Sequence, residues 1–179
     1  MSMFRKFINR LSGFGKDTRG AATVEFVILA PILFTTVFSV FESGWLMTKY
    51  MMLDRGLDLA VREVRLGIDP LASEDSIKAK VCEYALILRD CEAGLMIEMT
   101  PIAAVTDIPT TATTCADRTG GTTPLASFAI GGRSQIMYVR ACAIVDPIFP
   151  GMGIGLQLPK DASGGFALLA TSVFVNEPE

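Results

Sequence analysis

The first feature of the chain is a long apolar run near its beginning. From Ala21 to Phe41 it holds a single charged residue, Glu25. A helix rises 1.5 Å per residue, so a run of this length matches the bilayer's hydrocarbon core, which is about 30 Å thick. The pattern therefore predicts a transmembrane helix over residues 21–41.

Helical periodicity continues beyond the apolar run. Apolar residues recur at every third or fourth position along one face: Leu46, Tyr50, Leu53, Leu57, Ala60 and Val64. This spacing is typical of an amphipathic helix. Because the stripe spans fewer than three heptads, it favours contact with a domain core over a coiled-coil seam. We expect one long helix over about residues 21–66, with its second half packed under an external domain.

A second helix is predicted over about residues 74–88. Ser73 has the side chain of a helix N-cap, and the acids Glu74 and Asp75 follow it in the first turn. Ile77, Val81 and later apolar residues give this segment one apolar face. We expect that face to pack into the same core as the long helix.

Three later segments have the composition of β-strands. They are Leu95–Val105, Tyr138–Val145 and Phe166–Val175. A long loop rich in Thr, Gly and Pro separates the first two, and an irregular segment over residues 146–165 separates the last two. The order of elements predicts an α+β fold, in which the long helix packs on a small antiparallel sheet of about three strands.

Charge is distributed unevenly about the apolar run. Residues 1–20 carry five Lys/Arg and one Asp, whereas the remaining chain carries 11 Lys/Arg against 18 Asp/Glu. A basic leader before an apolar span predicts a cytoplasmic N-terminus and an external C-terminal domain. We therefore expect a leader at 1–20, a membrane helix at 21–41 and an extracytoplasmic domain at 42–179, which includes the helix extension 42–66. The acidic domain argues against nucleic acid as a partner.

All four cysteines follow the apolar run, which places them in an oxidising compartment if the orientation holds. Four cysteines allow three pairings. We prefer Cys82–Cys91 with Cys115–Cys142; the first pair requires the second helix to end near residues 86–88 and the chain to fold back. A zinc site made of all four thiolates is the alternative. The wide spacings, without a CxxC pair, disfavour any metal site.

The junction before the apolar run has the features of a processing site. A cleavable secretory signal would place small residues after its apolar region, but the chain after Val40 reads FESGWLMTKY. The small residues instead precede the run, at Gly20 and Ala21. A protease acting there would cut on the cytoplasmic side and leave the membrane helix in the product.

This arrangement resembles the type IV prepilin signal, in which a prepilin peptidase cuts after the glycine and a glutamate occupies the fifth mature position. Here those positions are Gly20, Ala21 and Glu25, followed by Phe26. Over about residues 19–67 the chain resembles the TadE-like family of pseudopilins. RGAATVEF, Pro31, the Glu42-x-Gly44 pair and the segment 60–65 carry this resemblance.

The resemblance implies a minor pilin-like protein of the tight-adherence (Tad/Flp) pilus machinery, with a pilin-like plan. Its implied role is pilus biogenesis in bacterial adhesion and biofilm formation. Its implied partners are prepilin peptidase, other pilins and pseudopilins, the inner-membrane assembly platform and membrane lipid. The implied location is the bacterial inner membrane, with one span and a periplasmic C-terminal domain. A type II secretion pseudopilin and an uncleaved, signal-anchored periplasmic binding protein or enzyme are the alternatives.

Glu25 and Pro31 need a physical account within the apolar run. A charged side chain at the bilayer centre costs about 2.5–3.5 kcal/mol on insertion scales. Cleavage after Gly20 would create an ammonium at Ala21, about 6 Å from Glu25 along the helix axis. Pairing with that ammonium, or with a neighbouring subunit's, would fix the axial register of packed helices. An acid that merely snorkels to the interface is the alternative. Pro31 removes a backbone donor, so a helix kink is expected there.

The sequence contains no recognisable active site. The chain has no histidine, which removes His-based triads and the commonest metal ligands. The spacing Gly151-x-Gly153-x-Gly155 is a fragment of a dinucleotide fingerprint, but it lies between prolines without a strand–helix context. We interpret it as a turn. We therefore expect no catalytic residues, no cofactor and no enzymatic activity.

Overall fold

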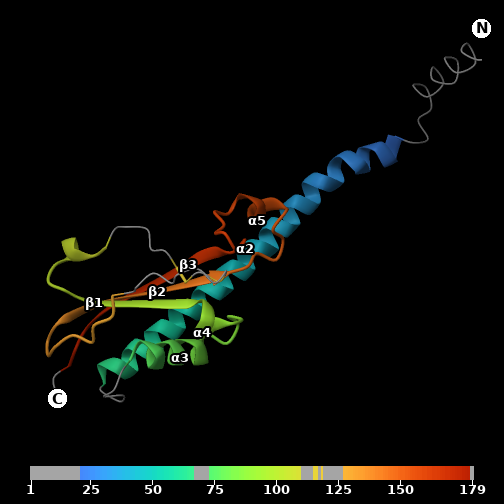
Figure 1. Cartoon of the computed structure of the whole chain (residues 1–179). Helices are drawn as coiled ribbons and strands as arrows, with labels where there is room; N and C mark the ends of the chain where they lie inside the picture. The colour runs from blue at the N-terminus through green and yellow to red at the C-terminus, as the bar shows by residue number, and fades with distance from the viewer. Residues whose placement is uncertain (1–20, 67–72, 110–114, 117, 119–126, 178–179) are drawn as a thin grey trace, which may run out of the picture.

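A computed structural model describes residues 21–66, 73–109, 115–116, 118 and 127–177 (Figure 1). The predicted leader and Gly20 lie outside these described residues. Along the chain the elements are α2 (Ala21–Arg65), α3 (Glu74–Tyr84), α4 (Cys91–Gly94), β1 (Leu95–Ile102), the 3₁₀ turn η2 (Val105–Asp107), β2 (Ile136–Val145), α5 (Gly153–Gln157) and β3 (Phe166–Val175).

The three strands form one antiparallel sheet in the order β1-β2-β3. Glu98 lies opposite Arg140, which in turn lies opposite Thr171. The predicted α+β fold, with its long N-terminal helix, second helix and three-stranded antiparallel sheet, is confirmed. β3 has the predicted bounds, whereas β2 begins two residues earlier than expected.

β1 is shorter than predicted, because it ends at Ile102 instead of Val105. The backbone N–H groups of Ala103 and Ala104 donate to the carboxylate of Asp107, at 3.0 and 2.9 Å. These bonds turn the chain into η2 and away from the sheet.

The core lies between α2 and one face of the sheet. Side chains alternate between the two faces of a strand, and the face toward α2 carries Leu95, Ile97 and Met99 of β1 and the odd-numbered residues of β2. The predicted stripe on α2 supplies the opposing side, with Leu53, Leu57 and Ala60 almost fully buried. Tyr50 is the exception, since it is 39% exposed. As Figure 1 shows, this packing uses the C-terminal half of α2, and the N-terminal half extends beyond the sheet.

α3 begins where the sequence predicts and ends earlier. Ser73 caps it: its hydroxyl accepts from the N–H of Ser76 at 3.2 Å. The helix stops at Tyr84 instead of near residue 88, because the chain turns at Ala85. This turn lets Cys82 and Cys91 form a disulfide across a Cα separation of 5.7 Å. This disulfide was expected to require that the helix end early and the chain reverse. Both occur, and the helix is even shorter than expected.

Gly56 allows α2 and α3 to approach closely. A Cβ at Gly56 would lie 2.7 Å from the carbonyl oxygen of Val81 and 3.3 Å from the Cβ of Ala85. The closest atom belongs to the α3 backbone, so the helix itself would have to move. A glycine at this point of the interface therefore sets the spacing between the two helices.

We predict that Gly56→Ala destabilises the domain while Gly44→Ala does not. Overpacking costs about 1–3 kcal/mol, against a gain of about 1 kcal/mol in helix propensity. Gly44 lies on the same helix, and a Cβ added there would meet no atom within 4 Å, so Gly44→Ala should show the propensity gain alone. Thermal unfolding in detergent, followed by circular dichroism, measures both; equal stabilisation by the two variants would contradict the close approach.

Candidate functional site

The N-terminal half of α2 is a bare apolar surface. Its large side chains are exposed around the whole helix, and Phe26 is 63% exposed. α2 is the one helix in the described chain that is long and apolar enough to cross a membrane, and only 6% of its most apolar 18-residue window is buried. A soluble core helix would be mostly buried, so this exposure suggests single-pass membrane anchoring.

Glu25 lies on this bare surface beside Phe26. Both side chains are exposed, and no hydrogen bond or ion pair joins Glu25 to another of the described residues. Gly20 and the side chain of Ala21 lie outside the described part of the structure. The proposed pairing of Glu25 with an ammonium at Ala21 therefore stays a prediction.

α2 continues as one helix through Pro31, and the expected kink stays a prediction. Hydroxyl side chains near Pro31 bond to backbone carbonyls one turn earlier. Thr35 bonds to the Pro31 carbonyl, and Thr36 and Ser39 donate to the carbonyls of Ile32 and Thr35 at 2.8 and 2.7 Å. These hydroxyl groups are satisfied within the helix, as an apolar environment requires.

Glu42 is a fully buried acid at the end of the apolar run. One carboxylate oxygen accepts from the N–H of Ile148 at 3.0 Å, and the other accepts from the N–H of Phe149 at 2.8 Å. We call these two hydrogen bonds the Glu42 clamp. Beside it, the ring of Phe149 packs on Phe38 of α2, with ring centroids 4.7 Å apart. The loop after β2 is thus fixed to α2 at the point where the apolar run ends.

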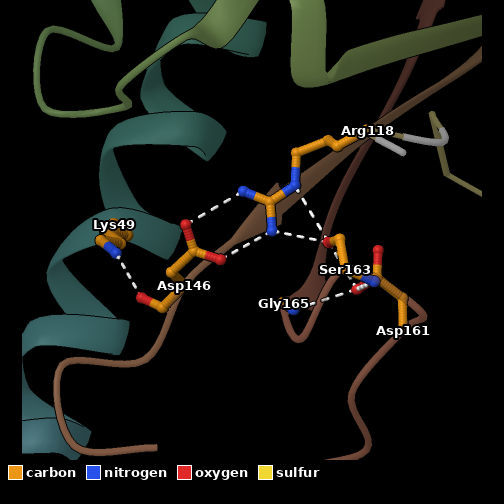
Figure 2. Close-up of polar contacts among 6 residues, drawn as sticks. All are labelled: Lys49, Arg118, Asp146, Asp161, Ser163 and Gly165. Atoms are coloured by element: carbon orange, nitrogen blue, oxygen red, sulfur yellow. Dashed lines mark hydrogen bonds and ion pairs between the residues drawn. The ribbon is translucent and has the colours of Figure 1, made fainter. Parts of the chain in front are cut away.

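A polar cluster joins the same loop to the rest of the domain (Figure 2). Arg118 donates two hydrogen bonds to the carboxylate of Asp146, at 3.0 and 2.6 Å, and also donates to Ser163 Oγ. From α2, Lys49 donates to the backbone carbonyl of Asp146 at 3.0 Å. On the far side, Asp161 accepts from Ser163 and from the N–H of Gly165. The cluster therefore connects α2, the end of β2 and the turn before β3.

Electrostatics within this cluster follow from these contacts. The hydrogen bonds from Arg118 lower the pKa of Asp146, partly offset by desolvation. The same bonds raise the pKa of Arg118. Burial lowers the pKa of Lys49, although Asp146 and Glu42 attract its charge and oppose this effect. The arginine–carboxylate pair is thus ionised at neutral pH, as bidentate geometry favours.

A second disulfide, between Cys115 and Cys142, lies on the sheet face away from α2. Its Cα atoms are 5.4 Å apart. Arg118 follows Cys115 by three residues, so the disulfide holds its segment against β2 and brings Arg118 within reach of Asp146. On the same face, the Glu98 carboxylate accepts from Nε of Arg140 at 3.0 Å. Both cysteine pairs are those preferred from the sequence.

Two hollows flank the clamp. One is a cleft of about 490 Å³ between α2, the turn at residues 87–90 and the end of β2, lined in part by Trp45, Lys49 and Arg89. The other is an apolar groove of about 550 Å³ where Met152 meets the helix around Pro31. The described residues contain no group of three or more His, Cys, Asp or Glu side chains that could hold a metal ion.

The Glu42 clamp and the Arg118–Asp146 pair could not be predicted from the sequence. The partners of Glu42 are backbone groups about a hundred residues away, and backbone groups leave no mark in a side-chain pattern. The detectable signal is Glu42 itself, an acid at the end of an apolar run. Gly153, predicted to lie in a turn, begins the five-residue helix α5, which packs on α2.

Comparison with known proteins gives one match. Residues 20–62 match the model of the family described as TadE-like protein. The matched segment contains Gly20, Ala21, Glu25, Phe26, Pro31 and Glu42. No curated protein and no solved structure matches the chain. The pilin-like plan of the domain therefore stays a prediction.

We predict that Glu42→Ala loosens the loop after β2. Removing the carboxylate leaves two amides without acceptors, and each buried amide left unpaired costs about 1–3 kcal/mol. Hydrogen exchange at the amides of Ile148 and Phe149 should accelerate, and thermal unfolding in detergent should shift down. Glu42→Gln keeps one carbonyl oxygen as acceptor and should lie between the wild type and Glu42→Ala. Unchanged exchange at both amides in Glu42→Ala would contradict the clamp.

Proposed function

We propose that this chain, which is TadE-like over residues 20–62, is a non-catalytic minor pseudopilin of a Tad-type pilus machinery. It would be made as an inner-membrane precursor, processed by prepilin peptidase between Gly20 and Ala21, and used in pilus biogenesis for bacterial adhesion and biofilm formation. The family match carries this proposal, because it covers the processing junction, Glu25 and the bare half of α2.

The structure supports the anchoring part of the proposal. The bare helix leads directly into a folded α+β domain, as expected of a subunit that presents its domain outside a membrane. The basic leader favours a cytoplasmic N-terminus and a periplasmic domain. Two disulfides in the domain suit an oxidising compartment.

Glu25 is proposed to set the axial position of α2 among neighbouring pilins or pseudopilins on the assembly platform. Its carboxylate has no partner among the described residues, and it lies in the bare apolar half of the helix. A charge in an apolar environment is stabilised by an opposite charge. Processing would supply that charge as the new ammonium at Ala21, on the same subunit or on its neighbour.

We predict that the mature protein begins at Ala21 in a strain with an active prepilin peptidase. The intact mass of the membrane-extracted protein, with both disulfides oxidised, measures this directly. Gly20→Leu, which replaces the small residue at the junction, should accumulate as the precursor. A mature N-terminus at Met1 or Met3 in the wild type would contradict the pseudopilin proposal and favour a signal-anchored binding protein.

We predict that Glu25→Ala is inserted and folded but does not support piliation. Removing the acid leaves the span more apolar, so insertion should not suffer, while the paired charge that sets the axial position is lost. Pili counted by electron microscopy, with membrane fractionation of the variant, separate these effects. Thr23→Ala changes another exposed residue two positions away and should leave piliation intact. Normal pili in Glu25→Ala would remove the proposed role of Glu25.

A further inference from the structure

The segment between Asp146 and Lys160 is a charge-free loop that lies along the predicted membrane span. Residues 147–159 read PIFPGMGIGLQLP, and Gln157 is their one polar side chain. Charged residues bound the loop at both ends. Figure 1 shows α5, in orange-red, beside α2 between the end of the sheet and the bare N-terminal half of the helix.

Contacts place the loop beside the predicted span, on the N-terminal side of its end at Phe41. A Cβ at Gly153 would overlap the side chain of Ser39 and lie 3.3 Å from the carbonyl oxygen of Thr35. Thr35 precedes Phe41 by six residues, which is about 9 Å along the helix axis. Met152 reaches further, because it lines one groove together with Pro31 and Phe34. The loop therefore occupies the same depth as the last two turns of the apolar run.

The span cannot be shortened to keep the loop outside the membrane. If the hydrocarbon region ended before Thr35, residues 21–34 would cross it with about 21 Å of helix, against a core of about 30 Å. The full run over 21–41 is needed, and its last part carries the loop. Leu156, 63% exposed, and Met152, 49% exposed, would then face the same surroundings as the bare helix.

The first part of the loop has several of its backbone groups paired within the protein. Glu42 accepts the N–H groups of Ile148 and Phe149, and the prolines at 147 and 150 have no N–H group. The Phe149 carbonyl accepts from the N–H of Met152. The Pro150 carbonyl accepts from Lys160 Nζ at 2.7 Å, which places Pro150 at the edge of the membrane, where an ammonium is tolerated, with Met152 and Leu156 deeper. In lipid an unsatisfied backbone group costs several kcal/mol, so these partners matter most at membrane depth.

Residues typical of a membrane interface lie on α2 just beyond the C-terminal end of the apolar run. Trp45 follows Phe41 by one helical turn, and the ammonium of Lys49 lies 5.7 Å from the centre of its ring. Tryptophan and lysine are typical of the headgroup level, about one turn beyond the hydrocarbon edge. The polar cluster around Asp146 and Arg118 begins where the charge-free loop ends.

We propose that residues 147–159 form a second membrane contact, inserted into the outer-leaflet side of the bilayer alongside α2, with lipid acyl chains covering Met152 and Leu156. Lipid is favoured over a second copy because the exposed loop continues the bare apolar surface of the helix and stops where the charged residues begin. Insertion of an apolar surface to about 5–10 Å is typical of interfacial elements. The proposal goes beyond pilus function and rests on the membrane anchoring of α2.

Depth measurements on the full-length chain test this proposal. Single cysteines replace Leu156, Ile32 and Val105 in turn, with the native disulfides intact, and carry an environment-sensitive fluorophore. Ile32 reports the anchor, and Val105, 82% exposed on η2, reports the aqueous domain. Each protein is reconstituted in phosphatidylethanolamine–phosphatidylglycerol vesicles with nitroxide-labelled acyl chains.

We expect blue-shifted emission and strong quenching at both Leu156→Cys and Ile32→Cys, with neither at Val105→Cys. Water-like emission at Leu156→Cys, with Ile32→Cys still quenched, would overturn the loop insertion and leave the anchoring intact. Loss of quenching at both sites would overturn the anchoring, and the loop proposal with it. A blue-shifted Leu156→Cys signal that disappears when the protein is diluted in lipid would show that a second copy covers the loop, which also overturns the proposal.

A pair of glycine variants tests how the loop is seated. Gly153 has a φ of +52°, and a Cβ there would overlap Ser39, so Gly153→Val is strained both in its backbone and by this contact. It should lift the loop from α2 and reduce quenching at Leu156→Cys, while Ile32→Cys is unchanged. Gly151→Val has no atom within 4 Å of the added Cβ and should leave both signals unchanged. Undiminished quenching at Leu156→Cys in Gly153→Val would contradict the seating of the loop on Ser39.

Discussion

The attachment of the loop after β2 to α2 depends on the buried carboxylate of Glu42. It lies where α2 changes from apolar on all sides to apolar on one side, and it accepts two amides from a loop that follows β2. A buried charge is tolerated only when its hydrogen-bonding capacity is met. Glu42 therefore holds the loop after β2 against α2, and the position of the loop beside the helix follows from it.

The elements that could be predicted well from the sequence are those in which apolar residues recur with a clear helical or strand pattern. The α2 stripe places Leu53, Leu57 and Ala60 in the core as expected, and β3 has its predicted bounds because its apolar run is bordered by a Gly pair and by Asn176. Boundaries were wrong where a local hydrogen bond competes with the period. Asp107 ends β1 early, and the turn at Ala85 ends α3 early. At the latter, the N–H of Leu88 donates to the Ala85 carbonyl at 3.0 Å. A hydrophobic pattern contains no information about either local interaction.

The functional residues divide in the same way. Gly20, Ala21 and Glu25 could be singled out because their spacing around the apolar run has a chemical meaning within one short segment, and their roles stay predictions. Glu42 and Arg118 act through partners far along the chain, so a local pattern could not reveal their roles. The family match ends at residue 62, and the amides bound by Glu42 lie far beyond it. Since backbone amides are present at any residue except proline, the clamp places few demands on the identity of the loop.

The hydroxyl groups along α2 affect the free-energy change when the lipid around the helix is replaced by protein. Thr36, Ser39 and Ser43 each bond to a carbonyl of their own helix, so they require nothing from lipid, water or another protein. Replacing the lipid around this surface with the helices of other subunits would then change van der Waals packing and leave the hydrogen bonds of these side chains as they are. Glu25 differs from them, because its hydrogen bonds and its charge must be met by whatever surrounds the helix. The electrostatic part of the free-energy difference between a lipid-embedded and a protein-embedded α2 would therefore be concentrated at one carboxylate near the N-terminal end of the helix.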